Sequence, residues 1–164
     1  MNSDQVLLDF LEIQRDVVLD ILAGLDEADW QRSILPSGWT PAGLLAHLAG
    51  AERHWFQGVV ADTDGPQPWD EGRPPYDFEA AFECDRPSAV IIDHYRQQCA
   101  RAREIVAAVG LSAVPRGIHG EPGMDEPADA RWVVLHMIEE TARHAGHLDV
   151  ARELLDGRTG LGPR

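Results

Sequence analysis

Residues 128–157 read ADARWVVLHMIEETARHAGHLDVARELLDG, and their apolar side chains recur at the spacing of a long helix. We expect this helix to run from about Ala128 to Asp156 and to end at Gly157, because glycine commonly terminates helices. Its apolar stripe comprises Val133, Met137, Thr141, Leu148, Ala151 and Leu155. No other predicted element in the chain is as long.

Three further segments have the same helical period, and stretches rich in proline and glycine separate them. We expect helices over Ser3–Gly24, Thr40–Ala61 and Pro87–Val109. Thr40 can cap its helix, and Pro41 suits the first helical position, where a missing N–H costs nothing. Four helices without a strand pattern predict an all-α fold, a four-helix bundle of antiparallel type.

The chain of 164 residues is long enough for one domain with a buried core. We expect residues 1–157 to form that single domain and residues 158–164 to form a frayed tail. Residues 62–86 are too long for a simple connector. Their aromatic side chains indicate a segment that folds onto the bundle: Trp69, Tyr76 and Phe78.

The chain is acidic, with 28 acidic and 14 basic residues and a formal net charge of −14. Such a charge repels phosphate backbones and anionic lipid headgroups, so we expect neither nucleic acid nor a membrane surface as a partner. No secretory pattern and no membrane-length apolar run is present, which favours a cytoplasmic protein. Cys84 and Cys99 lack CxxC spacing; reduced thiols are the simpler interpretation and a redox pair the alternative.

Three reactive side chains interrupt the apolar stripes. His47 lies three residues after Leu44 and four before Ala51, which places it on the core-facing side of its helix. Glu140 and His144 are four residues apart, so they stack on one face of the last helix. A buried carboxylate without a partner is costly, and a bound metal ion would remove that cost.

Two imidazoles and one carboxylate would give a divalent metal three protein ligands and leave a position open for water or substrate. This donor set suits Zn²⁺ best, and Ni²⁺, Co²⁺ and Fe²⁺ are also compatible with it. The alternative is that His47 is a hydrogen-bonded core histidine and that Glu140 and His144 form an ordinary surface pair. Gly146, in mid-helix, favours the metal site, since it is easiest to explain as room for another helix or a ligand.

The other histidines are weaker candidates. His147 is the possible catalytic residue, because it could act as a fourth ligand or a proton carrier. His136, one turn before the proposed carboxylate ligand, is interpreted as a core or rim side chain. We expect His119 to be a solvated loop residue, and the sequence does not identify a partner for His54 or His94.

Two stretches resemble motifs of the DinB superfamily of helical metal-binding proteins. The first comprises GWTP at 38–41, LLAHL at 44–48 and ERHW at 52–55, and the second is EETARHAGHLD at 139–149. The resemblance extends over essentially the whole chain in layout. It points to a branch near the mycothiol-dependent maleylpyruvate isomerases.

The resemblance implies a four-helix bundle with an unusual helix order and a metal site at one end. Family members bind the ion with a histidine of the second helix and two residues spaced by four on the last helix. Those positions fall on His47, Glu140 and His144. Many members have histidine at the position of Glu140, and many carry His-Arg-Gly-Gln where residues 144–147 here are His-Ala-Gly-His. Many relatives are homodimers, so we expect a homodimer.

Three functional hypotheses remain open. The resemblance implies a metal-dependent transferase or isomerase that uses mycothiol or bacillithiol on a small electrophilic substrate. The second hypothesis is metal-assisted hydrolysis without a thiol, in which His147 or Glu139 would be the general base. The third is a non-catalytic, stress-related bundle that binds a metal or ligand. No HExxH, GxSxG or dinucleotide motif offers a competing chemistry.

Overall fold

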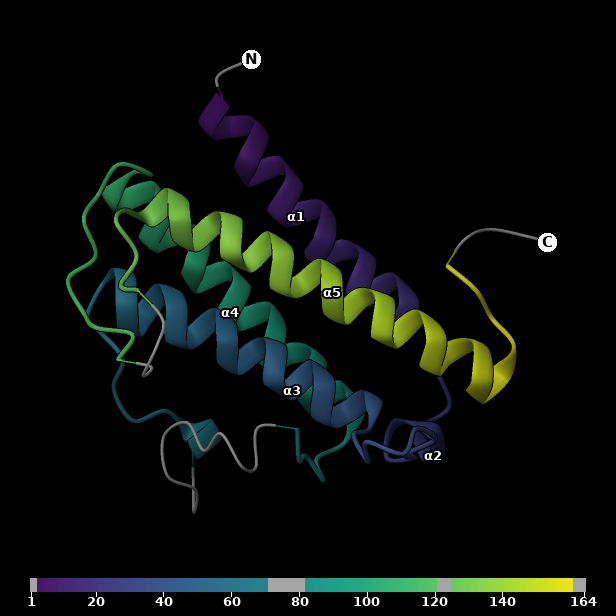
Figure 1. The fold of residues 1–164 in the computed structure, drawn as a ribbon. Helices are drawn as coiled ribbons and strands as arrows, with labels where there is room; N and C mark the ends of the chain where they lie inside the picture. The colour runs from purple at the N-terminus through teal and green to yellow at the C-terminus, as the bar shows by residue number, and fades with distance from the viewer. Residues whose placement is uncertain (1–2, 71–81, 121–124, 161–164) are drawn as a thin grey trace.

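Four long helices dominate the computed structural model, which describes residues 3–70, 82–120 and 125–160 (Figure 1). They are α1 (Ser3–Leu22), α3 (Pro41–Glu52), which continues directly as the π-helix η1 (Arg53–Val60), α4 (Ser88–Val109) and α5 (Ala130–Asp156). Two short pieces accompany them, the helical turn α2 (Glu27–Trp30) and the 3₁₀ turn η2 (Pro68–Asp70). The described residues contain no strand, so the expected all-α fold is confirmed.

The helix ends lie where the local signals place them. The Thr40 hydroxyl accepts a hydrogen bond from the backbone N–H of Gly43 (3.0 Å), and Asp129 caps α5 through the N–H of Trp132 (2.9 Å). Gly157 ends α5 in the left-handed conformation, with φ of 79°. Within the described part of the chain, no helix has both the length and the apolarity needed to cross a lipid bilayer.

The helix expected over Thr40–Ala61 changes its character in the middle. It is α-helical as far as Glu52 and π-helical over Arg53–Val60. In the wider π turn the N–H of Ala61 bonds the carbonyl of Phe56, five residues back (3.1 Å). The apolar spacing did not predict this change. π-Helical turns are rare and occur frequently at functional sites.

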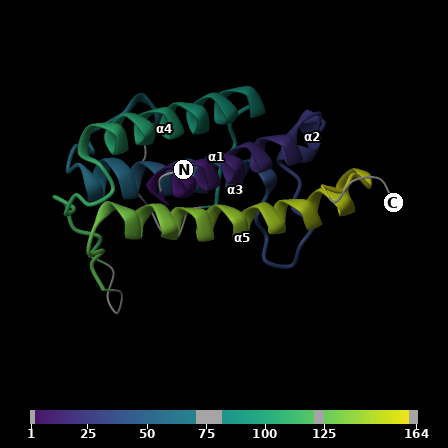
Figure 2. The ribbon, with the colours of Figure 1, turned by 90° about the horizontal axis from the view of Figure 1, so that it is seen from above.

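The order of the helices differs from a simple up-and-down bundle. Arg131 pairs with Asp4 (2.7 Å) where α5 and α1 both begin, and Arg152 bonds the carbonyl of Ile21 (2.8 Å) where both end. α1 and α5 are therefore parallel, and so are α3 and α4 (Figures 1 and 2). The antiparallel expectation was incomplete, because the long connection from η1 to α4 returns the chain to the opposite end of the bundle.

A buried ion pair crosses the centre of the bundle. Arg15 of α1 makes two hydrogen bonds to Glu52 of α3, at 2.7 and 2.5 Å, and the exposed fractions of these residues are 3% and 0%. Apolar side chains from all four long helices surround the pair. Cys84 and Cys99 are both buried, and neither forms a disulfide within the described chain.

The segment after η1 is fastened to the bundle by charge and by stacking. Arg53 pairs with Asp64 (2.6 Å) and with Asp70 (2.5 Å). Trp69 stacks on His94 of α4 with ring centroids 3.9 Å apart, which gives His94 a partner that the sequence did not identify. Trp69 thus folds onto the bundle as its aromatic character indicated; Tyr76 and Phe78 lie outside the described residues.

Three glutamine amides reinforce this attachment. Gln57 donates to Gln98 (2.6 Å), Gln98 to Gln67 (3.0 Å) and Gln67 back to Gln57 (3.1 Å), which closes a ring of hydrogen bonds. Each side chain comes from a different segment, namely η1, α4 and the stretch before η2. These hydrogen bonds therefore hold η1 and the segment that follows it against α4, and they do so with uncharged groups.

Candidate metal centre

Helices α3 and α5 bring the three predicted ligands together. The Nε2 atom of His47 lies 2.9 Å from Oε1 of Glu140, and Nε2 of His144 lies 3.0 Å from the same oxygen. One possible ligand atom from each residue lies within 4.8 Å of the other two. In the described ranges, this is the one group of three histidine, cysteine or acidic residues with such geometry.

The donor set fits a divalent metal ion. Tetrahedral zinc sites place their ligand atoms roughly 3.3 Å apart, so the observed separations of 2.9 and 3.0 Å would need only a slight opening. Two imidazole nitrogens and a carboxylate oxygen suit Zn²⁺, Ni²⁺, Co²⁺ and Fe²⁺ by ligand type. Three protein donors leave further coordination positions open, which is typical of reactive rather than purely structural sites.

The carboxylate of the group is held in its charged form. Hydrogen bonds from His144 and His47 lower the pKa of Glu140 well below its usual range, against the opposing effect of partial burial. The side-chain exposures are 11% for His47, 21% for Glu140 and 10% for His144. The group is thus shielded from bulk water but still reachable.

Phe82 covers one side of the group. Its ring stacks on His47 with centroids 4.2 Å apart and lies 5.8 Å from the ring of His144. Gly43, one turn before His47, permits this approach, because a Cβ there would collide with the carbonyl oxygen of Phe82. Nδ1 of His47 is buried and has no hydrogen-bond partner among the described residues, so the stack orients the ring.

His147 lies behind His144. The Nδ1 atoms of the two rings are 3.3 Å apart, so His147 faces the nitrogen of His144 that points away from Glu140. Burial, followed by the charges of His144 and Arg143, lowers the pKa of His147. The geometry is that of a residue that orients a ligand; service as a fourth ligand or as the catalytic residue stays a prediction.

Gly146 does not make room for a neighbouring helix, as we had expected it to do. The residue is exposed, and a Cβ built on it meets no atom of the described chain within 4 Å. No neighbouring helix therefore requires a glycine here, and that part of the prediction was wrong. No contact with the described residues requires a glycine at position 146, so the helix simply tolerates it there.

A second histidine pair joins η1 to the loop between α4 and α5. Nε2 of His54 and Nδ1 of His119 are 2.8 Å apart, which gives His54 a partner that the sequence did not identify. His119 is therefore not the solvated loop residue that we predicted. Gly117 makes the contact possible, because its N–H bonds the carbonyl of Val59 (2.9 Å) and a Cβ on it would collide with the carbonyl of Gly58.

Tryptophans join this pair to the last helix. His119 stacks on Trp55 with centroids 4.3 Å apart, and Trp55 lies 4.6 Å from the ring of His136. His136 in turn stacks on Trp132 (5.3 Å). His136 is thus the rim side chain that the sequence indicated. Because it precedes Glu140 by one helical turn, this aromatic cluster borders the candidate metal centre.

The described fold is an all-α bundle in which one histidine and a Glu-x₃-His pair from two helices converge, an arrangement of the kind expected of the DinB-like helical proteins. Comparison with known proteins places the chain more narrowly. Residues 6–157 match the model of the mycothiol-S-transferase family, and the chain belongs to that family. The predicted membership of the DinB superfamily is thereby confirmed.

A solved structure supports the fold independently. The chain is similar to a conserved protein from Enterococcus faecalis, with a TM-score of 0.73 and 15% sequence identity over 96% of this chain and 99% of that one. At this identity, the likeness shows the fold alone. A comparison with curated proteins found no significant match.

Proposed function

We propose that this protein is a metal-dependent transferase or isomerase that uses mycothiol as its thiol and acts on a small electrophilic substrate. The single observation that carries the metal-dependent part is the convergence of His47, Glu140 and His144 on one position. Membership of the mycothiol-S-transferase family supports the choice of thiol.

The proposal gives each residue of the site a role. Nε2 of His47, Oε1 of Glu140 and Nε2 of His144 would hold the ion. When bound, the ion would lower the pKa of a thiol at its open position, so that the thiolate is available near neutral pH. His147 would keep the imidazole of His144 in its orientation from behind (3.3 Å), and Phe82 would exclude water on the side of His47.

The proposed reaction needs no reagent other than the thiol and the electrophilic substrate. The thiol sulfur forms a bond to the electrophilic carbon, and the thiol proton passes to a base; exposed His147 is the proposed carrier. In a transfer, the leaving group departs with the electron pair of its bond to that carbon. In an isomerisation, the sulfur adds to a carbon–carbon double bond conjugated to a carbonyl group, and the π electrons move to the carbonyl oxygen as an enolate. After rotation about the resulting single bond, the enolate electrons re-form the double bond and expel the thiolate, which takes back its proton.

Cobalt-substituted protein tests the proposal directly. We expect mycothiol to produce a thiolate-to-cobalt charge-transfer absorption that saturates at one thiol per chain, and S-methylated mycothiol, which has no ionisable thiol, to produce none. Bacillithiol in place of mycothiol tests which thiol is preferred. The proposal fails if neither thiol changes the spectrum and neither accelerates turnover of any epoxide, conjugated acid or haloalkane.

A further inference from the structure

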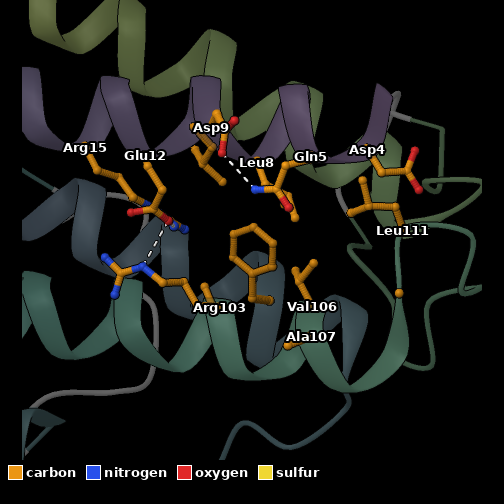
Figure 3. A pocket seen from close by; sticks show the side chains of 14 residues that line it. Asp4, Gln5, Leu8, Asp9, Glu12, Arg15, Arg103, Val106, Ala107 and Leu111 are labelled. Carbon is orange, nitrogen blue, oxygen red and sulfur yellow. Dashed lines mark hydrogen bonds and ion pairs between the residues drawn. The ribbon is translucent and has the colours of Figure 1, made fainter. Parts of the chain in front are cut away.

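A pocket of about 350 Å³ lies between α1 and α4 (Figure 3). α1 packs chiefly against α5, and α4 against α3 and η1, so the two facing helices leave this space between them. None of the residues that line the pocket belongs to the candidate metal centre. The pocket is therefore a separate feature, and the proposed function does not use it.

The body of the pocket is apolar. Leu8 of α1 faces Val106 of α4, and Leu11 of α1 and Phe56 of η1 also line the pocket. The pocket is open to solvent on one side, since Gln5, Asp9 and Arg103 of its lining are exposed. An apolar cavity of about 150 Å³ can hold benzene, and this pocket has more than twice that volume. It is large enough for an aromatic ring with a short alkyl chain.

The inner end of the pocket carries no net charge. Glu12 accepts hydrogen bonds from Arg15 (2.6 Å) and from Arg103 (3.0 Å), and Arg15 also binds Glu52. Two guanidinium groups and two carboxylates therefore cancel one another. Because both arginines are engaged with carboxylates, this end does not favour an anionic ligand.

Two aspartates lie along the α1 side of the pocket. Asp4 pairs with Arg131 (2.7 Å), but the partner of Asp9 in the described chain is the neutral amide of Gln5 (2.8 Å). Figure 3 shows Asp9 and Gln5 at the upper edge of the pocket. α4 ends beside Gly110, and the last carbonyls of a helix carry partial negative charge. The first turn of α1 has the opposite polarity, which Asp4 offsets.

We propose that this pocket is a second ligand site, which binds a primary amine carrying an aromatic ring or a short hydrocarbon chain. The ammonium group would lie near Asp9, and the hydrocarbon would pack against Phe56 and Val106. This assignment is independent of the proposed thiol chemistry, since the site shares no residue with the candidate metal centre.

Isothermal titration calorimetry with two matched probes tests the proposal. Phenylbutylamine and phenylbutyrate have nearly the same hydrocarbon body but opposite charges near neutral pH. We expect the amine to bind once per chain, at least about tenfold more tightly than the acid. Absence of amine binding, or binding of the acid at equal strength, would overturn the proposal.

Two variants and one control locate the binding. Ala107 lines the pocket and is exposed, so Ala107→Trp should fill the space and abolish binding without disturbing the core. Asp9→Asn should weaken the amine several-fold and leave the acid unchanged, and it remains informative if the bulkier variant misfolds. His47→Ala should bind the amine as the wild type does.

Either variant can also contradict the assignment. Unchanged amine affinity in folded Ala107→Trp would place the ligand elsewhere, and unchanged affinity in Asp9→Asn would remove the charge argument. If light scattering shows a dimeric wild type that Ala107→Trp converts to a monomer, with no amine bound by either, the pocket is a contact between two copies of the chain.

Discussion

Two carboxylates inside the bundle differ in the partners that surround them. Glu52, at the centre, is 0% exposed, and the guanidinium group of Arg15 holds both of its oxygens. Glu140, between α3 and α5, has a side-chain exposure of 21% and shares one oxygen between His47 and His144. Both carboxylates come from long helices, but only the second lies among groups that can also bind a metal.

This difference in partners distinguishes the structural ion pair of Arg15 and Glu52 from the candidate metal centre. Arginine keeps its charge at all accessible pH values and offers no lone pair, so the central pair neutralises itself and has no place for a ligand. Imidazoles can present a lone pair to a metal, so the hydrogen bonds around Glu140 can be exchanged for coordination. Changes in the first region should therefore affect folding, and changes in the second should affect binding.

Removal of the central carboxylate should have the largest effect. Glu52→Gln removes the buried carboxylate and leaves Arg15 with Glu12, which Arg103 shares, as its counter-charge. The free energy of unfolding of metal-free protein should therefore fall by about 3–5 kcal/mol. Urea denaturation measures this loss. The double variant Arg15→Met with Glu52→Leu, which removes both charges, should recover most of the stability. A loss below about 1 kcal/mol in the single variant would contradict the assigned role.

The corresponding change at the candidate metal centre should affect metal binding strongly and the free energy of unfolding only slightly. Glu140→Gln removes an anionic ligand, so the affinity for Zn²⁺ should fall by about 100-fold or more, whereas the stability of metal-free protein should change by less than about 1 kcal/mol. Competition with a chromophoric chelator gives the affinity. Wild-type affinity in this variant would show that the carboxylate does not bind the ion.

A third buried polar group, His94, should make the free energy of unfolding depend on pH. Burial, followed by the charge of Arg53, lowers the pKa of His94 to about 4 in the folded protein. In the unfolded chain, this imidazole takes up a proton at about pH 6.5. The contribution of neutral His94 to the free energy of unfolding is therefore fully present above that pH, and about 2 kcal/mol of it is lost as the pH falls towards 4.

His94→Gln should flatten this part of the pH profile. Urea titrations at several pH values between 6.5 and 4 compare the two proteins over the window in which His94 is neutral in the folded state and takes up a proton on unfolding. An equally steep fall in the variant would assign the acid sensitivity to other groups.

The smallest effect is expected at His147. His147→Ala removes the group 3.3 Å behind His144, so Zn²⁺ affinity should fall by about tenfold, the range typical of residues that orient a metal-ligating histidine. The same chelator assay measures it. A loss as large as that of Glu140→Gln would instead make His147 a ligand.

The sequence predicts those features that depend on local spacing. Helical period and capping residues placed the four long helices to within two residues, apart from the π-helical end of the second. The four-residue interval between Glu140 and His144 fixed their common face, and the position of His47 in its stripe turned it inwards. These are properties of single helices, so one sequence is enough to predict them.

Contacts between distant segments were not predicted. The stack of Phe82 on His47 and the pairing of His54 with His119 each depend on a glycine that lets one backbone approach another, Gly43 in the first case and Gly117 in the second. A glycine in a sequence does not show which segment it admits. The pairing of Arg15 with Glu52 was missed for the same reason, because helical period does not reveal which helices are diagonal neighbours.

The metal content of the purified protein tests the central claim most directly. Wild type, His47→Ala and His54→Ala, a histidine control on the same continuous helical segment, should be purified without chelators and analysed by mass spectrometry of the elements. We predict about one divalent ion per chain in wild type and in His54→Ala, and a loss of most of it in His47→Ala. No stoichiometric metal in the wild type, or full retention in His47→Ala, would contradict the account.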